Sequence, residues 1–308
     1  MDALVTGGAG FIGSHIVDAL VARGDSVRVL DDLSTGQSGN LNPAAQLIEG
    51  SIVDASVVAR AVAGVEVVFH LGALGAVARS VADPRASNAA NVDGTLNVLT
   101  EARDAGVRRV VFASSSSVYG GAEIVPTPES APLRPRSPYA ITKLTGDWYT
   151  RVFSELYDLE TVALRYFNVF GPRQRPDATY AAVIPLFAAA LIAGEAPVVH
   201  GDGTQSRDFT YVSDVVAANL AAASAPADRA SGHAFNIAPG EGTTLLELLD
   251  GLAARIGVAP NPVFVDTRPG DVHRSCADAT AARDVLGWAP TVSIRDGLAA
   301  YVDWIRSS

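Results

Sequence analysis

The sequence predicts an α/β protein built on a doubly wound parallel sheet. Short apolar runs alternate with amphipathic segments through the first half of its 308 residues, and a glycine-rich turn joins the first run to the first helix. Such alternation indicates a parallel sheet with helices on both faces. We expect strands at 2–6, 26–31, 46–49, 66–70, 109–114 and 160–166, and helices over 10–23, 55–62, 88–105 and 139–157.

The second half of the chain departs from this regular alternation. Pro185 falls within one predicted helix, as a kink or an early-turn residue. Ser213 stands where it could cap a second helix, and Thr244 with Glu247 forms a capping box at the start of a third. We expect helices over 181–193, 244–256 and 296–305, a strand at 233–238, and a strand followed by a helix within 207–223.

Composition and charge exclude several classes of protein. Hydrophobic residues make up 48% of the chain and charged residues 18%, which is typical of a folded rather than a disordered protein. The formal net charge is −10 and basic residues form no run, so we expect no nucleic-acid and no membrane partner. Cys276 is the single cysteine, and no apolar run reaches the roughly 20 residues of a membrane helix. We therefore expect a cytoplasmic protein without disulfides.

A glycine-rich turn follows the first predicted strand, in the segment VTGGAGFIGSH. Gly7 permits a tight turn, Gly10 lets the backbone approach a pyrophosphate, and Gly13 lets helix and strand pack closely. Asp31 ends the next strand about 20 residues further on, where a carboxylate would hold an adenosine ribose. The neighbouring LSTGQSG has no arginine or lysine, so we predict NAD rather than NADP. Asp32 is expected to face solvent or to cap the turn.

The segment SPYAITK places Tyr139 and Lys143 four residues apart, on one face of a predicted helix. A phenol has an ordinary pKa of about 10 and is a weak base at neutral pH. A lysine ammonium one turn away and a nicotinamide cation would both lower that pKa. The phenolate could then accept a proton from an alcohol. Four serines, 114–117, stand earlier in the chain at the end of a predicted strand and offer hydroxyl partners.

These motifs resemble the extended short-chain dehydrogenase/reductase family, and within it the nucleotide-sugar 4-epimerases of the UDP-galactose 4-epimerase type. The resemblance covers essentially the whole chain and rests on TGGAGFIGSH, HLGA, NVDGT, SSSSVYG, YAITK, LRYFNVFGPRQ, GDGTQSRDFTYVSDV and RPGDV. It implies a Rossmann-type NAD-binding domain over 1–167, to which the chain returns near 208–238. It also implies a smaller C-terminal α/β nucleotide-sugar domain over 168–308, and a homodimer formed through helices 88–105 and 139–157.

The resemblance implies a role for individual residues. Tyr139 resembles the catalytic base, Lys143 the residue that binds the nicotinamide ribose, and Ser115 the hydroxyl that hydrogen-bonds the sugar 4-OH. The cofactor residues that it implies are Gly7, Gly10, Phe11, Ile12, Gly13, Asp31, Asp32, Ser51, Ile52, Leu71, Gly72, Ala73, Asn91, Tyr139 and Lys143. The substrate residues that it implies are Ser115, Ser116, Ser117, Tyr139, Asn168, Val183, Phe187, Arg207, Arg268 and Asp271, and no metal is expected.

Two positions depart from the pattern of this family. Ser51 stands where the family often has an aspartate that contacts adenine, and the change loses a charge-assisted contact. Gly75 stands where many hexose epimerases carry a lysine near the cofactor phosphates. Together the two changes predict weaker cofactor binding than in those relatives. Arg173 and Arg175 of GPRQRPD either lie beside the sugar or are solvated.

The implied reaction inverts C4 of a UDP-hexose through a transient 4-keto sugar, as in the interconversion of UDP-glucose and UDP-galactose. UDP-glucuronate 4-epimerase is an alternative, because GPRQRPD also resembles those enzymes. Dehydratases carry Asp-Glu and decarboxylases Glu where this chain has Ser116 and Ser117, which argues against both reactions. Ser275, at a position that gates substrate size, is small and would admit an N-acetyl group. A non-catalytic NAD-binding regulator stays open, since fold alone does not decide function.

Overall fold

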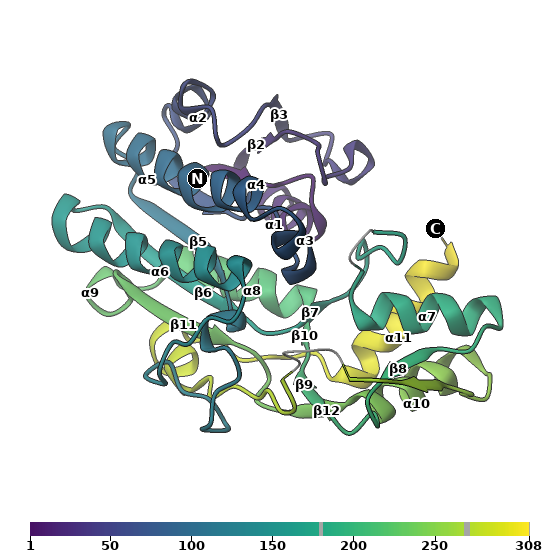
Figure 1. Ribbon diagram of the computed structural model, residues 1–308. Coiled ribbons are helices and arrows are strands. Elements are labelled where there is room, and N and C mark those ends of the chain that lie inside the picture. The colour runs from purple at the N-terminus through teal and green to yellow at the C-terminus, as the bar shows by residue number, and fades with distance from the viewer. Residues whose placement is uncertain (179–180, 268–271, 308) are drawn as a thin grey trace.

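A seven-stranded parallel sheet forms the centre of the computed structural model, which describes residues 1–178, 181–267 and 272–307. The strand order is β11-β6-β5-β4-β1-β2-β3, and the order reverses between β4 and β1 (Figure 1). Ligands of such sheets bind beyond the carboxyl ends of the strands at this reversal. The predicted doubly wound sheet is confirmed, with β1 (Asp2–Thr6), β2 (Ser26–Asp31), β3 (Gln46–Glu49), β4 (Val67–His70), β5 (Arg109–Ser115), β6 (Glu160–Tyr166) and β11 (His233–Ile237).

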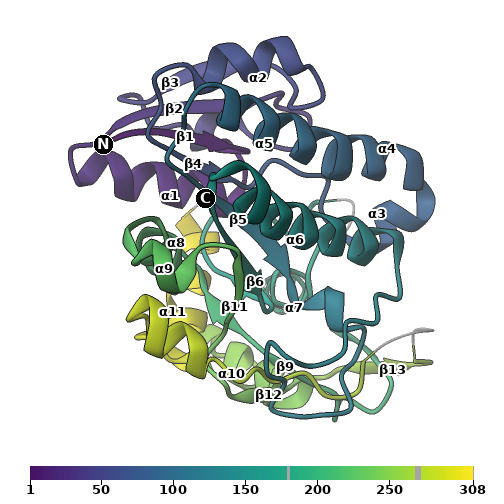
Figure 2. The same cartoon turned by 90° about the vertical axis from the view of Figure 1, so that its left-hand side faces the viewer.

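Helices cover both faces of the sheet (Figure 2). Neighbouring side chains of β1 point to opposite faces, so that Val5 joins the core beneath α1 and α8 while Leu4 joins the core beneath α2 and α5. Both side chains are fully buried, which explains why the strand is a continuous apolar run. The two layers consist of α1 (Phe11–Ala22) and α8 (Val212–Ser224) on one face, and of α2 (Ala55–Val62), α5 (Gly94–Asp104) and α6 (Pro138–Tyr157) on the other.

The helix predicted over 88–105 begins earlier and is not continuous. It starts as α4 (Pro84–Asn88), passes through a π-helical turn, η2 (Ala89–Asp93), and continues as α5. The Asp83 side chain caps α4 and accepts a hydrogen bond from the backbone N–H of Ala86 at 2.9 Å. An aspartate followed by a proline is a start signal for a helix, which the sequence prediction missed.

A second, smaller unit lies beyond the sheet, where α7, α10 and α11 surround a separate core (Figure 1). That core contains Phe187, Leu248 and Tyr301, each almost fully buried. Its main elements are α7 (Val183–Ala193), β8 (Val198–His200), α10 (Leu245–Ile256), β13 (Val263–Val265) and α11 (Ile294–Ser307). The remaining short elements are η1 (Ser38–Asn40), α3 (Val77–Ala82), η3 (Ser116–Tyr119), β7 (Val169–Phe170), β9 (Ser206–Asp208), β10 (Thr210–Tyr211), α9 (Ala227–Ala230), β12 (Gly242–Thr244) and η4 (Ala282–Leu286).

The predictions about helix starts have different outcomes. The capping box of α10 is confirmed: the N–H of Glu247 donates to the Thr244 hydroxyl at 3.2 Å, and the N–H of Thr244 donates to the Glu247 carboxylate at 2.8 Å. Pro185 lies in the first turn of α7, where a proline is tolerated. The prediction that Ser213 caps α8 is wrong, because the helix already begins at Val212 and Ser213 lies inside its first turn.

Candidate active site

The glycine turn between β1 and α1 is closed on itself and has no room for side chains. The N–H of Gly10 donates to the carbonyl of Gly7 at 3.1 Å, and Gly7 has a φ of +70°. A Cβ added to Gly13 would lie 2.2 Å from the Gly7 carbonyl oxygen, well inside van der Waals contact. The turn therefore brings bare backbone to the start of α1, where the positive end of the helix dipole favours an anion.

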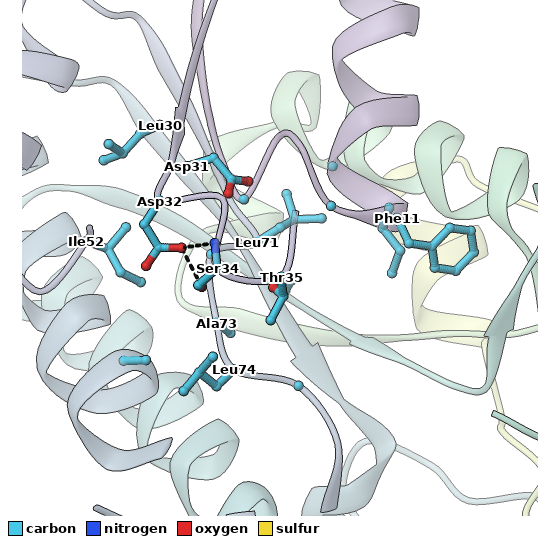
Figure 3. A pocket seen from close by; sticks show the side chains of 18 of the residues that line it. Phe11, Leu30, Asp31, Asp32, Ser34, Thr35, Ile52, Leu71, Ala73 and Leu74 are labelled. Atoms are coloured by element: carbon cyan, nitrogen blue, oxygen red, sulfur yellow. Dashed lines mark hydrogen bonds between the residues drawn. The ribbon is translucent and has the colours of Figure 1, made fainter. Parts of the chain in front are cut away.

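Asp31 is fixed beside this turn. One carboxylate oxygen accepts a hydrogen bond from the N–H of Ala9 at 2.9 Å, and the other accepts one from the N–H of Leu33 at 2.9 Å. The Asp32 carboxylate accepts from the N–H and the hydroxyl of Ser34, so it caps the turn after β2 as predicted (Figure 3). Asp31 is buried and pre-oriented, which suits a carboxylate that would hold two ribose hydroxyls.

A cavity of about 510 Å³ opens over the glycine turn and the ends of β1, β2 and β4. Figure 3 shows Asp31, Ile52 and Leu71 around it. Of the predicted cofactor residues, those that line the cavity are Gly7, Gly10, Phe11, Ile12, Gly13, Asp31, Asp32, Ser51, Ile52, Leu71, Gly72, Ala73, Tyr139 and Lys143. Residues that the sequence reasoning did not name also line it, among them Ser34, Thr35, Leu74, Ala90 and Tyr166.

Asn91 is the predicted cofactor residue that does not line this cavity. It lies in the π-helical turn η2 and is buried. Its side chain accepts a hydrogen bond from the N–H of Leu74 at 2.7 Å and donates to the Leu74 carbonyl and the Thr142 hydroxyl, both at 3.1 Å. Asn91 therefore ties the loop after β4, which does line the cavity, to the helix that carries Tyr139.

Tyr139 lies in the first turn of α6 and lines the cavity. Ser137 caps this helix and does not line the cavity. The Tyr139 N–H donates to the Ser80 hydroxyl at 3.0 Å, which fixes the turn. Within the protein, burial of the hydroxyl raises the pKa of Tyr139, and the nearby Ser115 side chain opposes this. The expected lowering of that pKa by Lys143 is therefore not seen in the protein alone.

Lys143 lies one turn further along α6 and is buried. Its ammonium group donates to the carbonyl of Ala113 at 2.8 Å and lies 5.1 Å from the centre of the Phe112 ring. Burial lowers the pKa of Lys143 to about 8, against the opposing charge of Asp147. Lys143 is also the single lysine among the 23 basic residues of the chain. Of these two residue types, lysine can lose its proton when it is buried, whereas arginine stays charged. The sequence prediction did not use the fact that the chain has a single lysine.

The four serines have different environments. Ser115 begins the turn η3 and accepts a hydrogen bond from the N–H of Ser117 at 3.2 Å. Ser114 is buried and lines the first cavity. The hydroxyl oxygens of Ser114 and Ser117 are buried without a hydrogen-bond partner among the described residues. Ser116 and Ser117 do not line either of the two cavities described here.

A second cavity, of about 730 Å³, lies between α7 and the strands β8 and β9. The predicted substrate residues that line it are Asn168, Val183, Phe187 and Arg207. Tyr166 lines the first cavity and Asn168 the second, so both cavities reach the segment at the end of β6. Gln174, His200 and Gln205 also line the second cavity and were not predicted. Arg268 and Asp271 lie outside the described residues.

The sequence placed Arg173 and Arg175 either beside the sugar or in solvent, and in the structure each forms an ion pair. Arg173 donates to the Asp18 carboxylate of α1 at 2.7 Å and does not line either cavity. Arg175 pairs with Asp177 at the surface. Arg173 thus links the segment after β7 to the helix that follows the glycine turn.

No helix among residues 1–178, 181–267 and 272–307 combines the length and the apolar character that crossing a membrane requires. No group of three or more histidine, cysteine, aspartate or glutamate side chains gathers there as a set of metal ligands.

Comparison with known proteins identifies the family. Residues 3–238 match the model of the NAD dependent epimerase/dehydratase family. The chain belongs to this family. A UDP-glucose 4-epimerase of Mycolicibacterium smegmatis is 42% identical, over 100% of this chain and 99% of the relative. The resemblance stated from the sequence is therefore confirmed.

Solved structures of this epimerase/dehydratase family share the whole fold. The UDP-glucose 4-epimerase of Thermotoga maritima, solved with UDP-glucose, has a TM-score of 0.95 at 40% identity, over 100% of this chain and 99% of that one. The UDP-N-acetylglucosamine 4-epimerase of Methanobrevibacter ruminantium, in complex with UDP-N-acetylmuramic acid, has a TM-score of 0.93 at 38% identity, over 99% and 98%.

NAD is the cofactor of this family member, and the residues around the first cavity fit it. Gly13 leaves no side chain at the start of α1, where a pyrophosphate would bind. The pinned Asp31 carboxylate suits the adenosine ribose, and Tyr139 with Lys143 stands at the other end of the cavity. Asp31 and Asp32 would repel a 2′-phosphate, which agrees with NAD rather than NADP.

Proposed function

We propose that the protein inverts C4 of a UDP-hexose, interconverting UDP-glucose and UDP-galactose. The observation that carries this proposal is that Tyr139 and Lys143, one helical turn apart, both line the NAD cavity, with the Ser115 side chain close to the Tyr139 hydroxyl. Tyr139 takes the proton of the sugar 4-OH, and Ser115 orients that hydroxyl. Bound NAD would supply the hydride chemistry at C4 that inversion requires.

The second cavity is proposed to hold the nucleotide. Asn168 and Arg207 line it, and an arginine fork suits the oxygens of a diphosphate. Val183 and Phe187 offer apolar surface for a base. Binding energy from this remote part of the substrate keeps the 4-keto sugar tethered while it turns its other face to Tyr139.

Ser116 and Ser117 bear on the competing reactions. Elimination to a 4-keto-6-deoxy sugar needs an acid and a base beside C5 and C6, and loss of CO₂ from a uronate is proposed to need one there too. Neither serine ionises near neutral pH, and the buried hydroxyl of Ser117 has no partner among the described residues. This favours an epimerase over a dehydratase or a decarboxylase.

A second candidate substrate pair is UDP-N-acetylglucosamine and its C4 epimer. Ser275 has a small side chain and is only half-buried, and its N–H donates to the carbonyl of Ser206 at 3.1 Å, next to Arg207 of the second cavity. A small residue there would leave room for an N-acetyl group. The similarity to the Methanobrevibacter ruminantium enzyme supports this candidate.

The substrate can be identified by incubating the purified protein and NAD⁺ with UDP-glucose, UDP-N-acetylglucosamine or UDP-glucuronate in separate reactions. The products are then resolved by NMR. We expect conversion to the C4 epimer without added reductant, fastest for UDP-glucose. Fastest turnover of the N-acetyl substrate would support the second candidate instead. Release of a 4-keto-6-deoxy sugar or of CO₂ would contradict epimerisation.

We further propose that the protein is a homodimer formed through α6. Four exposed apolar residues of α6 lie on one helix face, at spacings of seven, four and four residues: Ile141, Trp148, Val152 and Leu156. Trp148 is 59% exposed and Leu156 69%, which is costly for a face left in water. A second copy of the same helix offers a matching apolar face, as in other two-fold symmetric interfaces.

Trp148→Glu is expected to convert the dimer into a monomer, because each copy would place a charge in the apolar contact. Size-exclusion chromatography with light scattering measures the mass. Val263→Glu is the matched control, since Val263 is 50% exposed on β13 of the second unit and should leave the mass unchanged. A wild-type protein that is monomeric at micromolar concentration would contradict the proposal.

A further inference from the structure

A buried ion pair lies directly beneath the catalytic face of α6. The Asp147 carboxylate accepts a hydrogen bond from the Arg165 guanidinium of β6 at 2.8 Å, and the side chains are 3% and 7% exposed. Removing two charges from water costs about as much as their attraction returns, so such a pair adds little net stability. Its place in the core therefore calls for another explanation.

Asp147 lies one turn after Lys143, on the same buried face of α6. The charged and titratable groups that face Lys143 among the described residues are few. Tyr139 and His70 are neutral, because burial raises the pKa of the first and lowers that of the second to about 3. Asp147 is the anion that favours the ammonium form of Lys143.

Arg165 binds only one oxygen of the Asp147 carboxylate. The other, Oδ1, is buried without a partner within hydrogen-bonding distance among the described residues, and so is the Ser114 hydroxyl. Burial raises the pKa of Asp147, and the charge of Arg165 with the Ser114 hydroxyl opposes this. In a poorly solvated core, the Asp147 carboxylate acts on Lys143 with little screening by water, and the Arg165 charge opposes it.

Arg165 also reaches the turn that carries Ser115. Its guanidinium donates to the Tyr119 hydroxyl at 2.8 Å and to the carbonyl of Glu129 at 3.2 Å. Tyr119 in turn donates to the side chain of Asn236 on β11 at 2.7 Å. Tyr119 is the last residue of η3, the turn that Ser115 caps. The ion pair thus connects the helix of Tyr139 and Lys143 to the serine turn on the opposite side of the reacting hydroxyl.

We propose that Asp147 is a positioning residue of the reaction, which keeps Lys143 protonated and, through Arg165 and Tyr119, holds the Ser115 turn in place. The proposal rests on the proposed function for its catalytic meaning. Its electrostatic half concerns the protein alone and can be tested without turnover.

The first test uses the fact that Lys143 is the single lysine of the chain. Protein made with isotope-labelled lysine gives one lysine side-chain NMR signal, whose titration reports Lys143 directly. In Asp147→Asn the midpoint is expected to fall by about one pH unit, because the neighbouring anion is gone. Asp158→Asn is the matched control, since Asp158 is an exposed aspartate at the C-terminus of the same helix. An equal midpoint in the two variants would overturn the proposal.

A double variant separates this effect from damage to the fold. Asp147→Asn alone leaves Arg165 buried without its counter-charge, whereas Asp147→Asn with Arg165→Gln removes both charges together. The double variant is expected to melt at a higher temperature than the single one. Because loss of the Arg165 cation raises the Lys143 midpoint by itself, its reference is Arg165→Gln alone, and the double variant is expected to have the lower midpoint of the two. An equal midpoint in the double variant and in Arg165→Gln would show that the Asp147 charge does not act on Lys143, and would overturn the proposal.

The second test measures turnover against pH. In Asp147→Asn the alkaline limb of kcat is expected to move to lower pH with the Lys143 midpoint. Tyr119→Phe is expected to lower kcat about tenfold without moving that limb, because it loosens only the serine turn. Wild-type kcat in Tyr119→Phe would overturn the part assigned to Arg165. If wild-type protein converts none of the UDP-hexoses, the proposed function fails, while the NMR titration still decides the role of Asp147.

Discussion

Replacing Tyr139 by phenylalanine is expected to lower turnover by about 100-fold to 10,000-fold, which is the usual contribution of a positioned acid–base group. Tyr139 lines the NAD cavity with Ser115 close to its hydroxyl, and no other titratable hydroxyl of α6 lines that cavity among the described residues. The ring itself stays in place in the variant, so NAD and UDP should bind as in the wild type. Turnover is measured by NMR and binding by calorimetry.

A matched control lies on the same helix. Tyr149 packs against Phe153 with the ring centres 6.5 Å apart, away from the NAD cavity, so Tyr149→Phe should keep full turnover. Ser115→Ala should fall between the two, because it removes the hydroxyl beside Tyr139 and not the base. If Tyr139→Phe retained turnover within a factor of about ten of wild type, the assignment of the base would be wrong.

The fold could be predicted from the sequence to the extent that its signals are local. β1, β2, β3 and β6 have the predicted bounds, and the first three are followed directly by a glycine or an aspartate, which marks their ends. The π-helical turn η2 was not predicted, since nothing in the local pattern distinguishes it from an ordinary helix. Asn91 explains it afterwards: its side chain faces Leu74 and Thr142, which are far away in sequence.

The same distinction between local signals and contacts distant in sequence applies to the site. The glycine turn, Asp31, Tyr139 and Lys143 are recognisable from spacing within one or two neighbouring segments. The contact between Asp147 and Arg165, and the place of Gln174 in the second cavity, depend on how distant elements pack. In the protein alone, burial raises the pKa of Tyr139, which the sequence could not show, because a helical spacing shows a nearby charge but not the cost of burying a phenol. The lowering of this pKa by Lys143 together with the nicotinamide cation stays a prediction.

Gly13→Ala is expected to weaken NAD binding by at least about tenfold and to destabilise the protein by roughly 1–3 kcal/mol, as is usual for overpacking. The new methyl group would lie 2.2 Å from the Gly7 carbonyl oxygen and 3.0 Å from the Cα of Gly8, and both are backbone atoms. Relief requires the turn to move away from α1. The N–H groups that would hold the pyrophosphate then no longer point to one place.

The measurements are the melting temperature and the dissociation constant for NAD by calorimetry. Gly39→Ala is the matched control, because a methyl group there would meet no atom within 4 Å and Gly39 lies beyond β2 in the exposed turn η1. It should leave both values unchanged. A Gly13→Ala protein that binds NAD as tightly as Gly39→Ala would show that the pyrophosphate does not lie on this turn. The affinity loss should be much larger for NAD than for UDP, since the second cavity is lined by other segments of the chain.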